Sequence, residues 1–322
     1  MGMRRICGWM AGFGVLVPLL SAQVAITPRL AANAPLSVKL PAANLRIDAN
    51  LVLVPVSVCD AMNRPVTGLE REHFKVFEDK VEQTVTHFAM EDEPLAVGLV
   101  FDTSGSMGSK LRRSRMAASA FFKTANPEDE FFLVEFNDRP KLVAPLTRDY
   151  EEIQNHLAFA PSRVRTALLD AIFLAMHEMK KSTKSRKALL IISDGGDNSS
   201  RYSVTEVRNL VRESDVLFYA LGIYEPSGAR GRSPEELSGP GLLTEMAEQT
   251  GGRHLPVEDL SEMPDIAAKI GIELRNRYVL GYSPGNQPRD GRYHRVQVKL
   301  APPHGLPSLK AFWRTGYYAP AQ

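Results

Sequence analysis

Residues 95–107 read Leu-Ala-Val-Gly-Leu-Val-Phe-Asp-Thr-Ser-Gly-Ser-Met. The first seven are continuously apolar, which indicates a β-strand covered on both faces, as in the parallel sheets of α/β proteins. Residues 188–193 repeat this pattern. Helical patterns lie at residues 110–124, 166–180, 204–213, 242–249 and 263–275. This alternation over residues 94–276 predicts an α/β domain with a Rossmann-like, doubly wound and mostly parallel sheet.

On both sides of this region the chain has the pattern of β-structure. Short alternating runs at residues 51–59, 74–77 and 81–88 predict strands within an N-terminal flank, residues 45–93. Alternating runs return in a C-terminal flank, residues 277–322. Because two or three isolated strands are only marginally stable, we expect the two flanks to pair into one small all-β module.

The first 23 residues have the features of an export signal. Arg4 and Arg5 precede an apolar run from Ile6 to Leu20, and small residues suited to cleavage follow. This run is shorter than the about 20 residues that a membrane span needs. We therefore expect an exported protein, periplasmic or extracellular, that is membrane-anchored only if the signal stays uncleaved. Arg4-Arg5 could also form a twin-arginine signal. Residues 24–44, rich in Ala, Pro and Asn, are expected to form a flexible spacer.

Composition excludes several classes of protein. Of 322 residues, 44% are hydrophobic and 24% are charged, as in a folded protein. Without Arg4 and Arg5, the 39 basic residues become 37 and equal the 37 acidic ones. A neutral body has no long-range field for nucleic acid, so no such partner is expected. The basic stretch at residues 180–187 is interpreted as a solvated loop.

Removal of the signal leaves Cys59 as the single cysteine, which predicts a buried strand residue and no internal disulfide.

Oxygen-bearing side chains follow both buried strands at the point where each strand ends. Asp102, Ser104 and Ser106 alternate along the first loop, Asp194 follows the second strand, and Thr166 opens a helical pattern. Ligands of open α/β sheets bind at the carboxyl ends of strands. Oxygen donors without sulfur or imidazole favour a hard cation such as Mg²⁺. The sequence therefore predicts a cation site at this edge of the sheet.

These residues resemble the metal-ion-dependent adhesion site of von Willebrand factor type A domains, over about residues 94–275. Asp102, Ser104 and Ser106 match its D-x-S-x-S loop, Thr166 matches through the Ala-Leu-x-Asp-Ala pattern that follows, and Asp194 matches through Ser-Asp-Gly. The resemblance implies that these five residues hold Mg²⁺, or Mn²⁺ or Ca²⁺ in its place. It also implies a protein partner whose acidic side chain completes the coordination, without chemical turnover.

The flanks resemble a bacterial subgroup of von Willebrand type A-related proteins that is frequent in Acidobacteria. The similar runs are residues 53–58, 65–69, 74–79 and 278–284. One departure from the family concerns Val164-Arg165, which stands where Gly-Gly often precedes the threonine. The cationic Arg165 could repel a metal, or it could help to bind an incoming carboxylate.

Other interpretations stay open. Ser104 or Ser106 could simply cap the following helix. The cation could activate water in a metal-dependent hydrolase, or it could merely stabilise a structural envelope protein. No H-E-x-x-H pair, G-x-S-x-G elbow or Walker-type loop is present, so an enzyme is not expected. His156 and His177 fall on helical patterns. Asp170 and Asp197 are interpreted as solvated or as supports of the ligands.

Overall fold

The computed structural model describes residues 51–158, 165–224, 234–285, 290–301, 303, 305 and 308–321. The predicted signal and spacer lie outside these residues. Within the described parts of the chain, no helix is long and apolar enough to cross a membrane.

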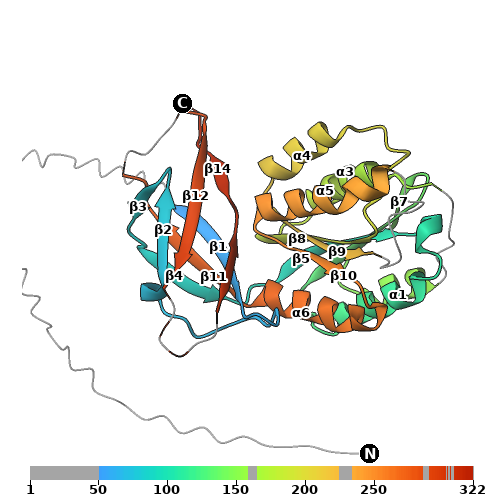
Figure 1. Cartoon of the computed structure of the whole chain (residues 1–322), viewed down its shortest axis with the longest axis horizontal. Helices are drawn as coiled ribbons and strands as arrows, with labels where there is room; N and C mark the ends of the chain where they lie inside the picture. Colours follow the sequence, from blue (N-terminus) through green and yellow to red (C-terminus); the bar gives the residue numbers. More distant parts are fainter. Residues whose placement is uncertain are drawn as a thin grey trace, which may run out of the picture. The chain divides into compact units, whose positions relative to one another are not determined.

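Among the described residues, six strands form the central sheet of the α/β domain (Figure 1), in the order β10-β9-β8-β5-β6-β7. They are β5 (Leu95–Asp102), β6 (Glu130–Phe136), β7 (Pro140–Thr147), β8 (Arg186–Ser193), β9 (Val216–Ile223) and β10 (His254–Val257). All neighbours pair parallel except β7, an edge strand antiparallel to β6. The mostly parallel sheet predicted from the apolar runs is therefore confirmed, with β5 and β8 side by side at its centre.

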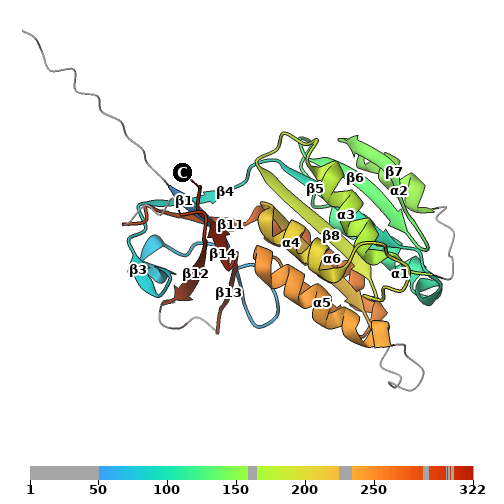
Figure 2. The ribbon, with the colours of Figure 1, turned by 90° about the horizontal axis from the view of Figure 1, so that it is seen from above.

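In the part of the chain that the structure describes, six α-helices cover the two faces of this sheet. They are α1 (Leu111–Phe122), α2 (Tyr150–Ala158), α3 (Leu168–Met179), α4 (Val204–Glu213), α5 (Pro234–Thr250) and α6 (Met263–Arg275). Figures 1 and 2 show α3, α4 and α5 on one face, with α1 and α6 on the other. Single turns of 3-10 helix lie at Arg71–His73 (η1), Gly105–Met107 (η2) and Leu260–Glu262 (η3).

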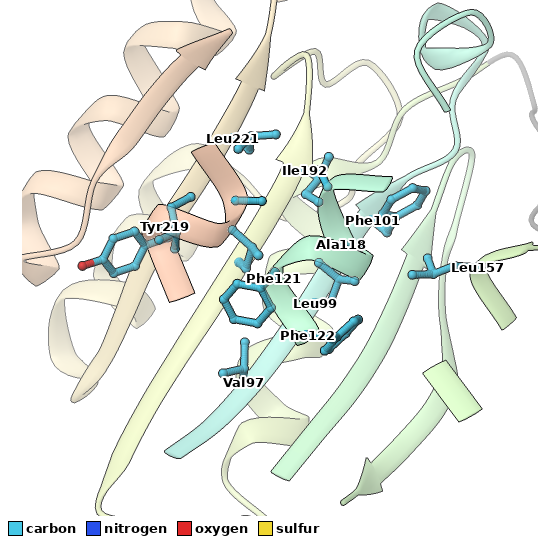
Figure 3. Close-up of a cluster of buried hydrophobic side chains, with 14 of the residues drawn as sticks. Val97, Leu99, Phe101, Ala118, Phe121, Phe122, Leu157, Ile192, Tyr219 and Leu221 are labelled. Carbon is cyan, nitrogen blue, oxygen red and sulfur yellow. The ribbon is translucent and has the colours of Figure 1, made fainter. Parts of the chain in front are cut away.

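Strand β5 is buried along its whole length because its side chains alternate between two cores. Val97, Leu99 and Phe101 point toward Phe121 and Phe122 of α1 (Figure 3). Ala96 and Val100 join the opposite core with α3 and α5. This burial on both faces explains the uninterrupted apolar run. The first polar residue after the run, Asp102, lies at the carboxyl-terminal edge of the sheet.

The flanks form two four-stranded sheets, ordered β13-β1-β11-β4 and β14-β12-β2-β3. Their strands are β1 (Val52–Cys59), β2 (Phe74–Glu78), β3 (Val81–Gln83), β4 (His87–Glu91), β11 (Arg277–Tyr282), β12 (Tyr293–Leu300), β13 (Lys310–Trp313) and β14 (Gly316–Tyr318). Strand β1 pairs antiparallel with β11, and β2 pairs antiparallel with β12. Because side chains of both sheets share one apolar core, the two flanks build one sandwich, and the α/β domain is inserted between them in the sequence.

A buried polar cluster connects the sandwich to the α/β domain. Arg253 pairs with Glu273 of α6 at 2.7 Å, and Glu273 accepts a hydrogen bond of 2.8 Å from the Tyr219 hydroxyl. Arg253 also contacts the Cys59 sulfur of β1 at 3.3 Å. Burial and the Glu273 charge raise the pKa of the Cys59 thiol to about 12. Cys59 is thus a buried strand residue, as predicted, and it stays protonated at neutral pH.

Candidate functional site

Asp102 is the last residue of β5, and its side chain is 0% exposed. One carboxylate oxygen accepts the Ser104 backbone N–H at 2.8 Å, and the other accepts the Ser193 hydroxyl at 2.6 Å. The Ser104 and Ser106 hydroxyls lie 3.1 Å apart. Met107 is fully buried in the core and anchors the end of this loop. The structure therefore brings the three residues of the D-x-S-x-S loop together.

Asp194 follows the end of β8 and is 8% exposed. Because β8 pairs in register with β5, its carboxylate lies near that of Asp102. Burial and the negative charge of Asp194 raise the pKa of Asp102 to about 7. The two carboxylates that the sequence placed at neighbouring strand ends thus interact electrostatically.

Thr166 is 5% exposed, and its backbone forms hydrogen bonds with the loop that follows Asp194. Its backbone N–H donates to the Asn198 side chain at 3.0 Å, and its carbonyl accepts the N–H groups of Asn198 and Ser199. Helix α3 begins at Leu168, two residues later than the predicted opening at Thr166. Arg165 is exposed to solvent. No direct contact between Thr166 and Asp102 is among the described interactions.

The helix-cap interpretation of the serines is wrong. The N-cap of α1 is Lys110, and the Ser104 side chain makes no capping hydrogen bond at the short η2 turn. Since the following helix does not use the two hydroxyls, their convergence needs another explanation.

Asp170 and Asp197 support the loop that follows Asp194. Asp170 accepts the N–H groups of Arg201 and Tyr202 at 2.7 and 3.1 Å. Asp197 accepts the N–H of Ser200 at 3.2 Å. Both carboxylates satisfy backbone donors, so they position the loop.

Lys110 and Ser193 belong to the site, although the sequence did not single them out. The Lys110 ammonium lies 3.4 Å from an Asp194 oxygen, and Lys110 is 5% exposed. Ser193 could have been noticed as a polar residue that ends a buried strand. For Lys110 no local signal existed, because a lysine next to a helix start is usually solvated.

The residues present fit a hard divalent cation. Two buried carboxylates and neighbouring hydroxyls supply only oxygen donors. Among the described residues, no three His, Cys, Asp or Glu side chains gather into a metal-binding group. Two close carboxylates in a buried position also carry an excess of negative charge, which a cation would offset.

Comparison with known proteins identifies the class of domain. Residues 97–196 match the family model of the von Willebrand factor type A domain. The chain therefore contains a von Willebrand factor type A domain, and the resemblance noted in the sequence is confirmed. This match names the domain only, so membership of the bacterial subgroup stays a prediction.

Individual relatives are distant and larger. Mouse inter alpha-trypsin inhibitor heavy chain 4 is 31% identical over 153 residues, which are 42% of this chain and 16% of that protein. An uncharacterized protein of Borreliella burgdorferi is 25% identical over 210 residues, covering 56% of this chain and 61% of its own length. This chain thus spans less than two thirds of either relative.

A solved structure titled von Willebrand factor type A from Catenulispora acidiphila is 13% identical to this chain. It covers 85% of this chain and 73% of its own, with a TM-score of 0.49.

Proposed function

We propose that this protein is a cation-dependent binding module. Asp102, Ser104, Ser106, Thr166 and Asp194 hold one divalent cation, Mg²⁺ or in its place Mn²⁺ or Ca²⁺, and an acidic side chain of a protein partner completes the site. The von Willebrand factor type A domain supports a protein-interaction or adhesion module in general. The cation, its ligands and the acidic partner are our extension of that class.

The observation that carries the proposal is the burial of Asp102 beside Asp194. Two neighbouring buried carboxylates destabilise each other, and the single ammonium of Lys110 beside Asp194 leaves a net negative charge that a bound cation would offset. Hydrogen bonds from the Ser104 N–H and the Ser193 hydroxyl hold the Asp102 carboxylate in place before any ligand arrives.

The hydroxyl donors determine what the site can bind. Ser104, Ser106 and Thr166 offer neutral oxygens, so they add no negative charge to that of the two carboxylates. A bound cation would supply an electrophilic position that favours a carboxylate from outside. Ser106 is exposed, so the loop presents this position to solvent.

The hydrolase interpretation needs a general base, and neither His156 nor His177 supports it. His177 lies nine residues beyond Leu168 in α3, about 13 Å along the helix, and its ring bonds the Phe173 carbonyl at 3.0 Å. His156 lies near Glu135, whose pKa is raised by burial, an effect that the nearby His156 partly offsets. Glu135 extends into the α1–α2 side of the sheet, whereas alternation along β5 points Asp102 to the other side.

Export also remains part of the proposal. It rests on the pattern of residues 1–23, which predicts a periplasmic or extracellular protein, membrane-anchored only if that segment stays uncleaved. The neutral charge of the rest of the chain gives no reason to expect nucleic acid as a partner.

A peptide-binding assay tests the proposed function. Immobilised hexapeptides that contain one Glu are compared with matched peptides that contain Gln, in Mg²⁺ and in EDTA. We expect Glu-dependent binding in Mg²⁺ that EDTA and Asp102→Ala both abolish. The matched control is Asp265→Ala, which removes a carboxylate exposed on α6.

Binding that survives EDTA, or that does not distinguish Glu from Gln, would contradict the proposal. Cleavage of the peptides in Mg²⁺ would favour the hydrolase instead.

A further inference from the structure

Lys110 occupies an unusual place for a lysine. Its side chain is 7% exposed, and it lies at the N-cap of α1. Its carbonyl accepts the Ser114 N–H at 3.0 Å and the Ser114 hydroxyl at 3.1 Å, which fixes the backbone from which the side chain extends.

Two effects raise the free energy of the charged Lys110 ammonium at this position. Burial removes the water that stabilises an ammonium group. The N-terminus of a helix carries partial positive charge, which repels cations. Some negative charge must offset both costs, and the Asp194 carboxylate at 3.4 Å supplies it.

The geometry of this pair is that of a counter-ion. Charge-assisted hydrogen bonds from an ammonium to a carboxylate are usually about 2.7–2.9 Å long. At 3.4 Å the ammonium balances the charge of Asp194 without binding it tightly. Its charge acts from the same buried region in which the cation ligands converge.

We propose that Lys110 is a built-in counter-ion of the cation site, which stabilises Asp194 in the cation-free protein and lowers the affinity of the site for divalent cations. This inference rests on the proposed function. With Lys110 present, the two carboxylates and one ammonium sum to a formal charge of −1. Without it the sum is −2, and a buried site of greater negative charge binds a divalent cation more tightly. Lys110 therefore keeps the site intact when empty and makes cation binding weaker and reversible.

Calorimetric titration of Mg²⁺ into the parent protein and Lys110→Met tests this inference. We expect Lys110→Met to bind Mg²⁺ at least about tenfold more tightly, because one repelling charge is removed. Lys110→Arg keeps the charge and should stay within about threefold of the parent. Lys269→Met, which breaks the exposed 2.8 Å pair with Asp265 on α6, is the matched control and should leave the affinity unchanged.

Thermal unfolding gives a second readout. In EDTA, Lys110→Met should melt below the parent, since Asp194 loses its counter-ion. Saturating Mg²⁺ should then raise its melting temperature by more than it raises that of the parent. A lysine that only supports the fold would lower both melting temperatures equally, and this result would overturn the inference.

The remaining outcomes are also decisive. Equal or weaker Mg²⁺ binding by Lys110→Met would overturn the role of Lys110 and leave the proposed function intact. Binding by Lys110→Met but not by the parent would contradict the proposed function, because that function requires the parent to hold the cation. Absence of binding to the parent and to every variant would refute the cation site itself, and the inference with it. If Lys110→Met does not fold, Lys110→Gln carries the same expectation, because its amide still donates a hydrogen bond to Asp194.

Discussion

Asp102 combines full burial with a neighbouring carboxylate and only neutral hydrogen-bond donors on its two oxygens. Burial alone disfavours the charged form, and Asp194 disfavours it further, so the pKa of Asp102 rises to about 7. A protein selected for stability alone would place an apolar side chain here. This perturbed carboxylate supports the proposed binding role, since perturbed carboxylates gather at functional sites.

At the same scale, His254 predicts a pH dependence of stability. Its ring nitrogens bond the Thr244 hydroxyl at 2.8 Å and the Tyr224 hydroxyl at 3.0 Å. Burial lowers its pKa from 6.5 to about 4. Between these values the unfolded chain binds a proton that the folded chain does not, so stability is present above pH 6.5 and is lost as pH falls toward 4.

The variant His254→Gln cannot titrate and isolates this contribution. From pH 7 to 4.5, the melting temperature of the parent should fall by about 2–4 °C more than that of the variant, which corresponds to roughly 1 kcal/mol for a partly exposed group. Parallel pH profiles would show that His254 takes up its proton normally in the fold.

Residue patterns predicted the part of the site that is local in sequence. Asp102, Ser104 and Ser106 lie within one loop, so their meeting follows from strand–loop geometry. The pairing of Lys110 with Asp194 joins residues 84 positions apart. Such a contact depends on the packing of α1 against the sheet, which no spacing along the chain specifies.

At the scale of elements, uninterrupted apolar runs were the most informative signal. They located β5 and β8, and the period of α6 gave its bounds, Met263–Arg275. The first turns of α5 were missed, because Pro240 lies inside it and helical periodicity was clear only at residues 242–249. Edge strand β7 was missed as well, since it contains prolines and is mostly half-buried or exposed.

The packing of β5 predicts a contrast between two glycines. A Cβ at Gly98 would lie 2.2 Å from a ring atom of Phe132 in β6 and 2.6 Å from Leu189 in β8. Gly98→Ala should therefore destabilise the protein by about 1–3 kcal/mol. Gly241 in α5 has no atom within 4 Å of such a Cβ, so Gly241→Ala should stabilise it by about 0.5–1 kcal/mol.

Urea unfolding of both variants measures this contrast. A Gly98→Ala variant as stable as the parent would mean that β6 and β8 do not pack against β5 as closely as described.

At the scale of the whole molecule, a short connection and buried polar contacts join the β sandwich to the α/β domain. The chain passes from α6 into β11 within two residues. Glu273 of α6 forms an ion pair with Arg253 and accepts a hydrogen bond from the Tyr219 hydroxyl. Glu273 and Arg253 are both buried, so removing either partner would leave a buried charge unpaired. From the sequence, the two flanks were expected to pair only because two or three isolated strands are marginally stable. The registers of β1 with β11 and of β2 with β12 arise from long-range contacts that composition does not encode.

The proposed site holds one divalent cation at the carboxyl-terminal edge of the central sheet. Calorimetric titration of Mg²⁺ and Mn²⁺ into the purified parent protein, Asp102→Ala and the control Asp265→Ala tests it most directly. We expect saturable binding at one site in the parent and the control, and affinity weakened by roughly 100-fold or more in Asp102→Ala, because a buried carboxylate ligand is lost. Binding of equal strength in Asp102→Ala, or no binding to the parent, would contradict the proposed cation site.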